Sequence, residues 1–141
     1  MSWQPGPTPE LRPPSEAEAD VREFCQAHAD WVVEGCYADL VQAALAFGPR
    51  LIFLDPGTAR CEAHCLARPW EPHKFSSAAE QDAQLAGLLD WVRSYDRRAD
   101  ATSRVAHHAL VDGYAGPVRT LRRPPALDAS LQALWDWART G

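Results

Sequence analysis

The four consecutive apolar residues 51–54 constrain the fold of this chain more than any other feature. They lie between Arg50 and the turn-forming run Asp55-Pro56-Gly57, so the apolar segment has the length of a strand and is too short for a helix. A strand without polar alternation is typical of a parallel sheet that is covered on both faces. The sequence therefore predicts a buried strand at 51–54 in an α/β fold.

Segments with helical spacing and further strand-like runs surround this strand. We expect helices at 16–29, 40–45, 58–67, 77–95, 102–113 and 127–138. Capping boxes of the form S-x-x-E, Ser15 with Glu18 and Ser77 with Glu80, mark two helix starts. Short strands are expected at 31–33 and 118–121. The pattern predicts a small parallel sheet of two or three strands flanked by helices.

Composition excludes several classes of function. The net charge of -5 provides no basic surface for a nucleic acid, and no apolar stretch approaches the roughly 20 residues that span a bilayer. The Pro-rich start lacks the apolar core of a signal peptide, so we expect a cytoplasmic protein with no membrane partner. The four cysteines are then expected to be reduced thiols.

We interpret residues 1–141 as a single domain with four segments. These are a Pro-rich N-terminal segment (1–15), a β-α core (16–66), a lid-like loop (67–76) and a C-terminal helical part (77–141). Two prolines prevent a regular helix in the third segment, which carries charged residues and is expected to be exposed.

Several motifs resemble a bacterial family of small P-loop kinases, described as shikimate-kinase-like or adenylate-kinase-like ATPases. The resemblance extends from Trp3 to about Arg119. It is carried by the segments 31–37 (WVVEGCY), 51–56 (LIFLDP), 67–75 (ARPWEPHKF), 80–82 (EQD) and 88–92 (LLDWV). It implies a P-loop kinase fold in which the ATP γ-phosphoryl group is transferred to a small acceptor with the help of magnesium.

One departure from the family concerns the nucleotide site. The family begins with a strand and a G-x-x-x-x-G-K-[ST] phosphate loop ahead of the tryptophan that resembles Trp3, and this motif occurs nowhere in the sequence. The resemblance places that first strand at the centre of the sheet, so the strands at 31–33 and 51–54 would be separated by a gap. Either a real loss or a start assigned too far downstream would explain the difference. We expect the chain alone not to bind ATP.

The resemblance also implies roles for individual residues. Glu34 would hold the water shell of magnesium, and Arg68, His73 and Lys74 would form a lid over the transferred phosphoryl group, with Glu34, Arg68 and Lys74 catalytic. Arg12, Tyr37 and Asp39 would bind the acceptor, for which an arginine favours an anionic molecule. The alternative without function is that Glu34 lies in a turn after a strand and that the other charged residues are solvated surface charges.

Two other interpretations stay open at this stage. A non-catalytic, degenerate kinase module could bind a ligand or a protein partner, including a second copy of the chain in a homodimer. The spacing of Cys61, His64 and Cys65 on one helix face could instead hold zinc if His73 supplied a fourth ligand. We expect no metal site, because cysteines at such spacing are more often small packing residues.

Overall fold

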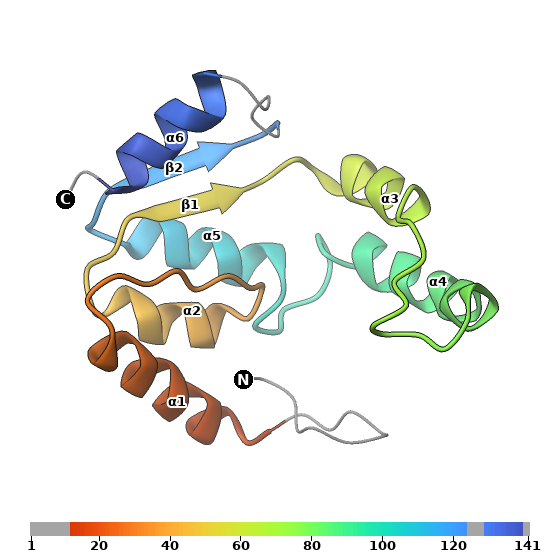
Figure 1. Ribbon diagram of the computed structural model, residues 1–141, viewed down its shortest axis with the longest axis horizontal. Coiled ribbons are helices and arrows are strands. Elements are labelled where there is room, and N and C mark those ends of the chain that lie inside the picture. Colours follow the sequence, from red (N-terminus) through yellow and green to blue (C-terminus); the bar gives the residue numbers. More distant parts are fainter. Residues whose placement is uncertain (1–11, 124–128, 140–141) are drawn as a thin grey trace. The chain divides into compact units, whose positions relative to one another are not determined.

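The computed structural model describes residues 12–123 and 129–139, which form two compact units (Figure 1). The first unit combines the chain up to residue 51 with residues 99–118, and the second combines residues 52–98 with the chain from residue 119 onward. Most of the predicted Pro-rich segment and the predicted helix position Leu127 lie outside the described residues. Each unit is described by itself.

Three helices build the first unit: α1 (Pro14–Ala27), α2 (Ala38–Leu45) and α5 (Arg104–Gly113). Helix α2 packs against both α1 and α5. The core consists of small residues, and its buried members are Val21, Cys25, Ala43 and Ala44. Small side chains allow the helices to approach closely, and the four core residues are buried between them.

The first predicted capping box is wrong. Helix α1 begins at Pro14 after the N-cap Pro13, and Ser15 already lies inside the helix without capping it. Proline suits the first helical position, because its fixed φ is helical and its missing N–H leaves no donor unsatisfied there. The helix therefore begins one residue before Ser15.

The predicted strand at 31–33 is also wrong. The segment is extended, and Trp31 and Val33 pack against the core while Val32 is 79% exposed. This alternation is typical of a strand, but a strand needs a neighbour for its backbone hydrogen bonds. Among the described residues the sheet has two strands, and this segment is not one of them. The segment is instead held at its end, where Ala38 N–H donates to Ala101 O and His107 Nε2 donates to Cys36 O.

The sheet contains β1 (Leu51–Leu54) and β2 (Val118–Leu121), the two strands that the sequence also predicts at these residues. The strands are parallel: Leu51 N–H donates to Pro117 O, and Asp55 N–H donates to Leu121 O, each at 2.9 Å. The described part of the chain is therefore an α/β structure with six helices and a two-stranded parallel sheet.

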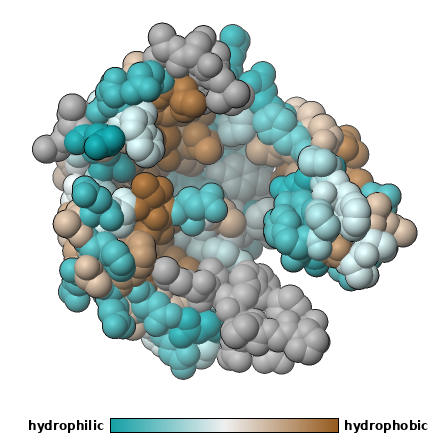
Figure 2. All heavy atoms as spheres, viewed as in Figure 1, coloured by the Kyte–Doolittle hydropathy of each residue, from teal (hydrophilic) through white to brown (hydrophobic). Residues whose placement is uncertain are grey.

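Strand β1 is less buried than its sequence predicts. Leu51, Ile52 and Phe53 are half-buried, and Leu54 is 65% exposed. Figure 2 shows hydrophobic side chains at the surface over β1 and β2. The expectation of burial on both faces is wrong because two strands provide too little sheet for helices to cover both of its faces.

The helices of the second unit are α3 (Thr58–Leu66), α4 (Ala78–Arg93) and α6 (Ala129–Arg139), and α3 packs against α4. One half of the second predicted capping box forms at the start of α4, where Ser77 Oγ accepts the Glu80 N–H. The Glu80 carboxylate, however, accepts the N–H and hydroxyl of Ser76, one residue before the cap. None of the helices in the described ranges is long and apolar enough to cross a membrane.

Candidate functional site

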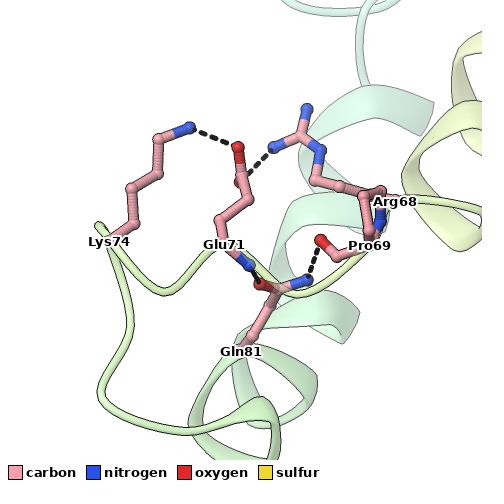
Figure 3. A network of polar contacts seen from close by, with 5 residues as sticks. All are labelled: Arg68, Pro69, Glu71, Lys74 and Gln81. Carbon is pink, nitrogen blue, oxygen red and sulfur yellow. Dashed lines mark hydrogen bonds and ion pairs between the residues drawn. The ribbon is translucent and has the colours of Figure 1, made fainter.

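The loop between α3 and α4 gathers charged side chains around Glu71 (Figure 3). Lys74 Nζ donates to Glu71 Oε1 at 2.9 Å, and Arg68 NH1 donates to Glu71 Oε2 at 3.4 Å. Arg68, Glu71 and Lys74 are spaced by three residues each, and the prolines at 69 and 72 keep the intervening chain out of a continuous helix. The loop thus brings together two of the residues predicted to form the lid.

The backbone of Glu71 is held as firmly as its carboxylate. Its N–H donates to Gln81 Oε1 at 2.8 Å, and its carbonyl oxygen accepts the N–H groups of Lys74 and Phe75. Gln81 Nε2 donates in turn to Pro69 O at 3.2 Å, so one side-chain amide of α4 binds the loop at two points (Figure 3). Because α4 is a regular helix, this amide fixes where the loop turns.

The electrostatics of the loop favour an ionised Glu71. The hydrogen bond from Lys74 lowers the pKa of Glu71 most, partial burial opposes this, and the positive charges of Lys74, Arg68 and His73 lower the pKa further. The side chains of Arg68 and Lys74 remain about half exposed. Their charges are accordingly accessible to an anion in solution that competes with Glu71.

An open groove of about 550 Å³ adjoins the loop within the second unit. Its apolar lining comes mainly from Phe75, Leu85, Leu88 and Trp91, while Arg68, Glu71 and Gln81 contribute polar atoms at one end. Arg98 lies over the Trp91 ring with 4.0 Å between its guanidinium carbon and the ring centroid, and it donates to the Trp91 carbonyl oxygen. The groove therefore combines apolar side chains with the charged side chains of Arg68 and Glu71.

Arg12, a predicted acceptor-binding residue, is engaged within the first unit. It pairs with Asp20 and with Glu16, and the hydrogen bond that it donates to Asp20 is the largest cause of its raised pKa. An anionic acceptor at Arg12 would have to compete with these two carboxylates of α1. These ion pairs hold the Arg12 side chain against the first two turns of α1.

The remaining predicted residues of the first unit lie around the extended segment. Glu34 is exposed near its end, and the half-buried Tyr37 is the N-cap residue of α2. The Asp39 carboxylate accepts the N–H of the next residue, Leu40, at 2.9 Å. Asp39 therefore belongs to the first turn of α2, where a negative charge suits the helix dipole.

The predicted zinc ligands Cys61, His64 and Cys65 all lie on α3. Cys61 and Cys65 are half-buried free thiols, and His64 is exposed. No group of three or more potential metal ligands converges anywhere in the ranges that the structure describes. Burial raises the pKa of Cys61 most, and the neighbouring Cys65 and Asp55 raise it further, so this thiol is protonated at neutral pH.

The described residues do not fit the triphosphate of ATP. The nearest equivalent of a phosphate loop is the passage from β1 through Gly57, with φ +86°, into α3. There Thr58 Oγ1 donates to Asp96 Oδ2 at 3.1 Å, and Asp55 lies two residues before the glycine, although the first turn of α3 itself has no acidic residue. The chain's single lysine, Lys74, lies in the loop instead. A phosphate loop needs a lysine and backbone N–H groups directed at the anion.

Two residues of the loop site have no role assigned from the sequence alone. Glu71 and Gln81 lie within the segments 67–75 and 80–82, which carry the resemblance, but neither residue receives a role from it. The signal that could have identified Glu71 is its position three residues from both Arg68 and Lys74, a spacing at which opposite charges meet on one turn. Gln81 is ten residues away from Glu71, and no local spacing rule connects the two.

Comparison with known proteins adds no relative. No family model matches the chain, no curated protein matches it, and no solved structure matches it. The resemblance to P-loop kinases therefore depends on the sequence motifs.

Proposed function

We propose that this chain carries the lid and acceptor-side part of a P-loop-kinase-like phosphotransferase and that, by itself, it does not bind ATP. The observation that carries the proposal is the ion-paired loop, in which Arg68 and Lys74 converge on one carboxylate beside an open groove. Two cations that converge on one point can equally converge on a phosphoryl group, whose developing charge they would stabilise.

In this proposal Glu71 acts as an internal substitute for the anion. Arg68 and Lys74 are kept about 3 Å from carboxylate oxygens when no phosphate is bound, so their side chains are ordered in advance. Gln81 keeps the loop backbone in place while the partners exchange. His73, the third residue of the predicted lid, lies in the same loop. Glu34 and the acceptor-side residues Tyr37 and Asp39 keep the roles that the resemblance implies.

The direct test uses inorganic tripolyphosphate and Mg-ATP as separate probes. Lys74 is the only lysine, so its ammonium can be labelled by reductive ¹³C-methylation, which preserves the charge, and followed by NMR. We expect tripolyphosphate to shift the Lys74 signal. The Glu71→Gln variant should respond at lower tripolyphosphate concentration because the competing charge is gone, and Arg68→Gln should respond more weakly.

Calorimetry with Mg-ATP supplies the second half of the test. We expect no more heat than tripolyphosphate alone produces, because the sequence has no G-x-x-x-x-G-K-[ST] phosphate loop. Selective, saturable Mg-ATP binding would contradict the claim about ATP. A Lys74 signal that does not respond to any polyphosphate would contradict the lid role.

A second candidate function is a non-catalytic module that binds an anionic ligand or a protein partner. The absence of a phosphate loop from the sequence favours it, as does the exposed Leu54 side chain of β1. The two candidates differ in what happens when a nucleotide-binding partner is added. A phosphotransferase part should restore ATP-dependent chemistry to such a partner, whereas a binding module should not.

A further inference from the structure

We infer that the free edge of β1 pairs with β1 of a second copy of this chain, forming an antiparallel, two-fold dimer. This inference rests on backbone geometry and charge. It goes beyond the proposed phosphotransfer role, in which the first strand that the resemblance implies would occupy the same edge of β1. In a strand, the N–H and C=O groups of successive residues point to alternate sides. Leu51 and Asp55 donate to β2, so Ile52 and Leu54 direct their backbone groups to the opposite edge. The sheet has no third strand among the described residues to receive them.

The two edges of the sheet differ in how they are protected. Strand β2 carries the exposed Arg119 and is followed by the exposed Arg122 and Arg123, and such charges discourage pairing with another strand. Strand β1 has no charged residue, no proline and no bulge, and its Leu54 side chain is 65% exposed. An unprotected apolar edge of this kind is where another strand adds.

Hydrogen bonding selects one register for two copies of β1. In a two-fold antiparallel pair, each step forward along one strand is matched by a step backward along the other. Only Ile52 and Leu54 direct their backbone N–H and C=O groups to this edge. When Ile52 of each copy pairs with Leu54 of the other, the four N–H groups at this edge donate to the four carbonyl oxygens. Phe53 then faces Phe53 of the second copy in a non-hydrogen-bonded pair, with about 4.5 Å between the Cα atoms, where aromatic side chains pack across strands.

The charges at the ends of β1 agree with the same arrangement. Arg50 precedes the strand and Asp55 follows it, so each end carries a different sign. An antiparallel pair places the positive end of one copy beside the negative end of the other, whereas a parallel pair would align like charges. Pairing β1 with β2 of another copy would be a head-to-tail contact, which leaves an unpaired edge for each further copy. Pairing β1 with β1 uses the same edge in both copies and produces a closed dimer.

The expected association is weak, because two four-residue strands cover less area than the roughly 1,200 Å² of a stable interface. Sedimentation equilibrium of the full chain, up to about 1 mM, should show a monomer–dimer equilibrium with a dissociation constant of about 100 µM. Leu54→Lys should raise this constant at least about tenfold, because two added charges face each other across the edge.

Leu66→Lys is the matched control, since Leu66 is 63% exposed in the same unit and lies on α3 away from the edge. It should change the dissociation constant by less than about twofold. Circular dichroism checks that both variants are folded. A monomer at every concentration, an oligomer larger than a dimer, or equal responses to the two lysines would overturn the inference.

The register has its own test, which also serves if Leu54→Lys does not fold. In a chain with Cys36→Ser, to remove the exposed thiol, Phe53→Cys should form a disulfide-linked dimer on mild oxidation. Phe47→Cys in the same background should not, although Phe47 is an exposed phenylalanine outside the sheet. Equal cross-linking of the two variants, or none at position 53, would contradict the proposed pairing.

Discussion

The two compact units of this chain are stabilised in different ways. The first unit buries a small apolar core, in which Val21 and Ala43 are at most 2% exposed. In the second unit only one described hydrophobic residue, Val92, is buried, at 8% exposure, and the loop between α3 and α4 is organised by ion pairs and a side-chain amide. Burial of apolar area is insensitive to salt and pH, while exposed ion pairs are sensitive to both. The first unit should therefore behave as a scaffold, and the second as the part that responds to ligands and solution conditions.

The largest effect should come from a charge placed in the apolar core. Val21→Asp should destabilise the chain by about 3 kcal/mol or more, because the carboxylate has no partner among the apolar core residues. Val32→Asp is the matched control in the same unit, and its exposed side chain predicts a change within about 0.5 kcal/mol. Urea denaturation followed by circular dichroism measures both. If the two variants lose similar stability, the core does not hold this unit together.

Two glycine substitutions should shift stability in opposite directions. A Cβ on Gly116 would clash with the Tyr114 ring, whose hydroxyl donates to Pro49 O and so holds the ring in place. Gly116→Ala should therefore cost about 1–3 kcal/mol in the first unit. A Cβ on Gly87, in the middle of α4, meets no atom within 4 Å.

Gly87→Ala should stabilise the second unit by about 0.5–1 kcal/mol, because alanine loses less backbone entropy in a helix. Thermal unfolding of both variants provides the measurement. A stabilising Gly116→Ala would mean that the Tyr114 ring is free to move, against the fixed contact with Pro49.

The helix caps allow a finer comparison of the two units. Ser103 caps α5 by accepting the Ala106 N–H and is completely buried, whereas Ser77 caps α4 in an exposed position. Ser103→Ala should cost about 1–2 kcal/mol, because water cannot replace the lost acceptor, and Ser77→Ala about 0.5 kcal/mol. Denaturant titrations of the two variants, made in parallel, test this order. Equal losses would show that burial does not control the value of the cap.

The elements that the sequence predicts correctly are those fixed by local rules. The strands at 51–54 and 118–121, the start of α4 at Ser77 and the irregular loop at 68–75 follow from apolar runs, capping and prolines. The segment 31–33 has the composition of a strand, but pairing depends on a neighbour that the local sequence does not contain. The same reason explains the partial exposure of β1.

The candidate site divides in the same way. Arg68 and Lys74 are recognisable from the sequence because they are charged residues in a conspicuous loop. The partners that give them their geometry are not, since Gln81 reaches the loop from the next helix. Arg12 shows the converse: its residue type favours an anionic ligand, but it already pairs with two carboxylates of the helix that follows it, α1. Spacing along the chain identifies charged groups, and tertiary contacts decide which of them are available.

Proteolysis at Lys74 tests whether Glu71 orders the loop. An endoproteinase specific for lysine has one cleavage site in this chain. Glu71→Gln should increase the cleavage rate about threefold or more, because the ion pairs to Arg68 and Lys74 are lost and the loop opens more often. Glu62→Gln is the control: it removes the ion pair with Arg93 between α3 and α4 but leaves the loop intact. A similar acceleration in both variants would assign the effect to general loosening of the unit.

The smallest effect concerns the pH at which the loop loosens. The pKa of Glu71 is lowered in the folded state, so the ordering of the loop is complete above the ordinary carboxyl value of about 4.3 and is lost as the pH falls through the lower, folded value. The ¹³C-methylated Lys74 signal should therefore move below about pH 4 and be constant above about pH 5. Glu80, whose pKa is lowered chiefly by the hydrogen bond from the Ser76 hydroxyl, titrates nearby, so Glu71→Gln is measured in parallel. The transition at Lys74 should disappear in that variant. If the transition persists in the variant, Glu80 and not Glu71 controls the loop. The Glu71 carboxylate shown in Figure 3 would then have no part in the pH response.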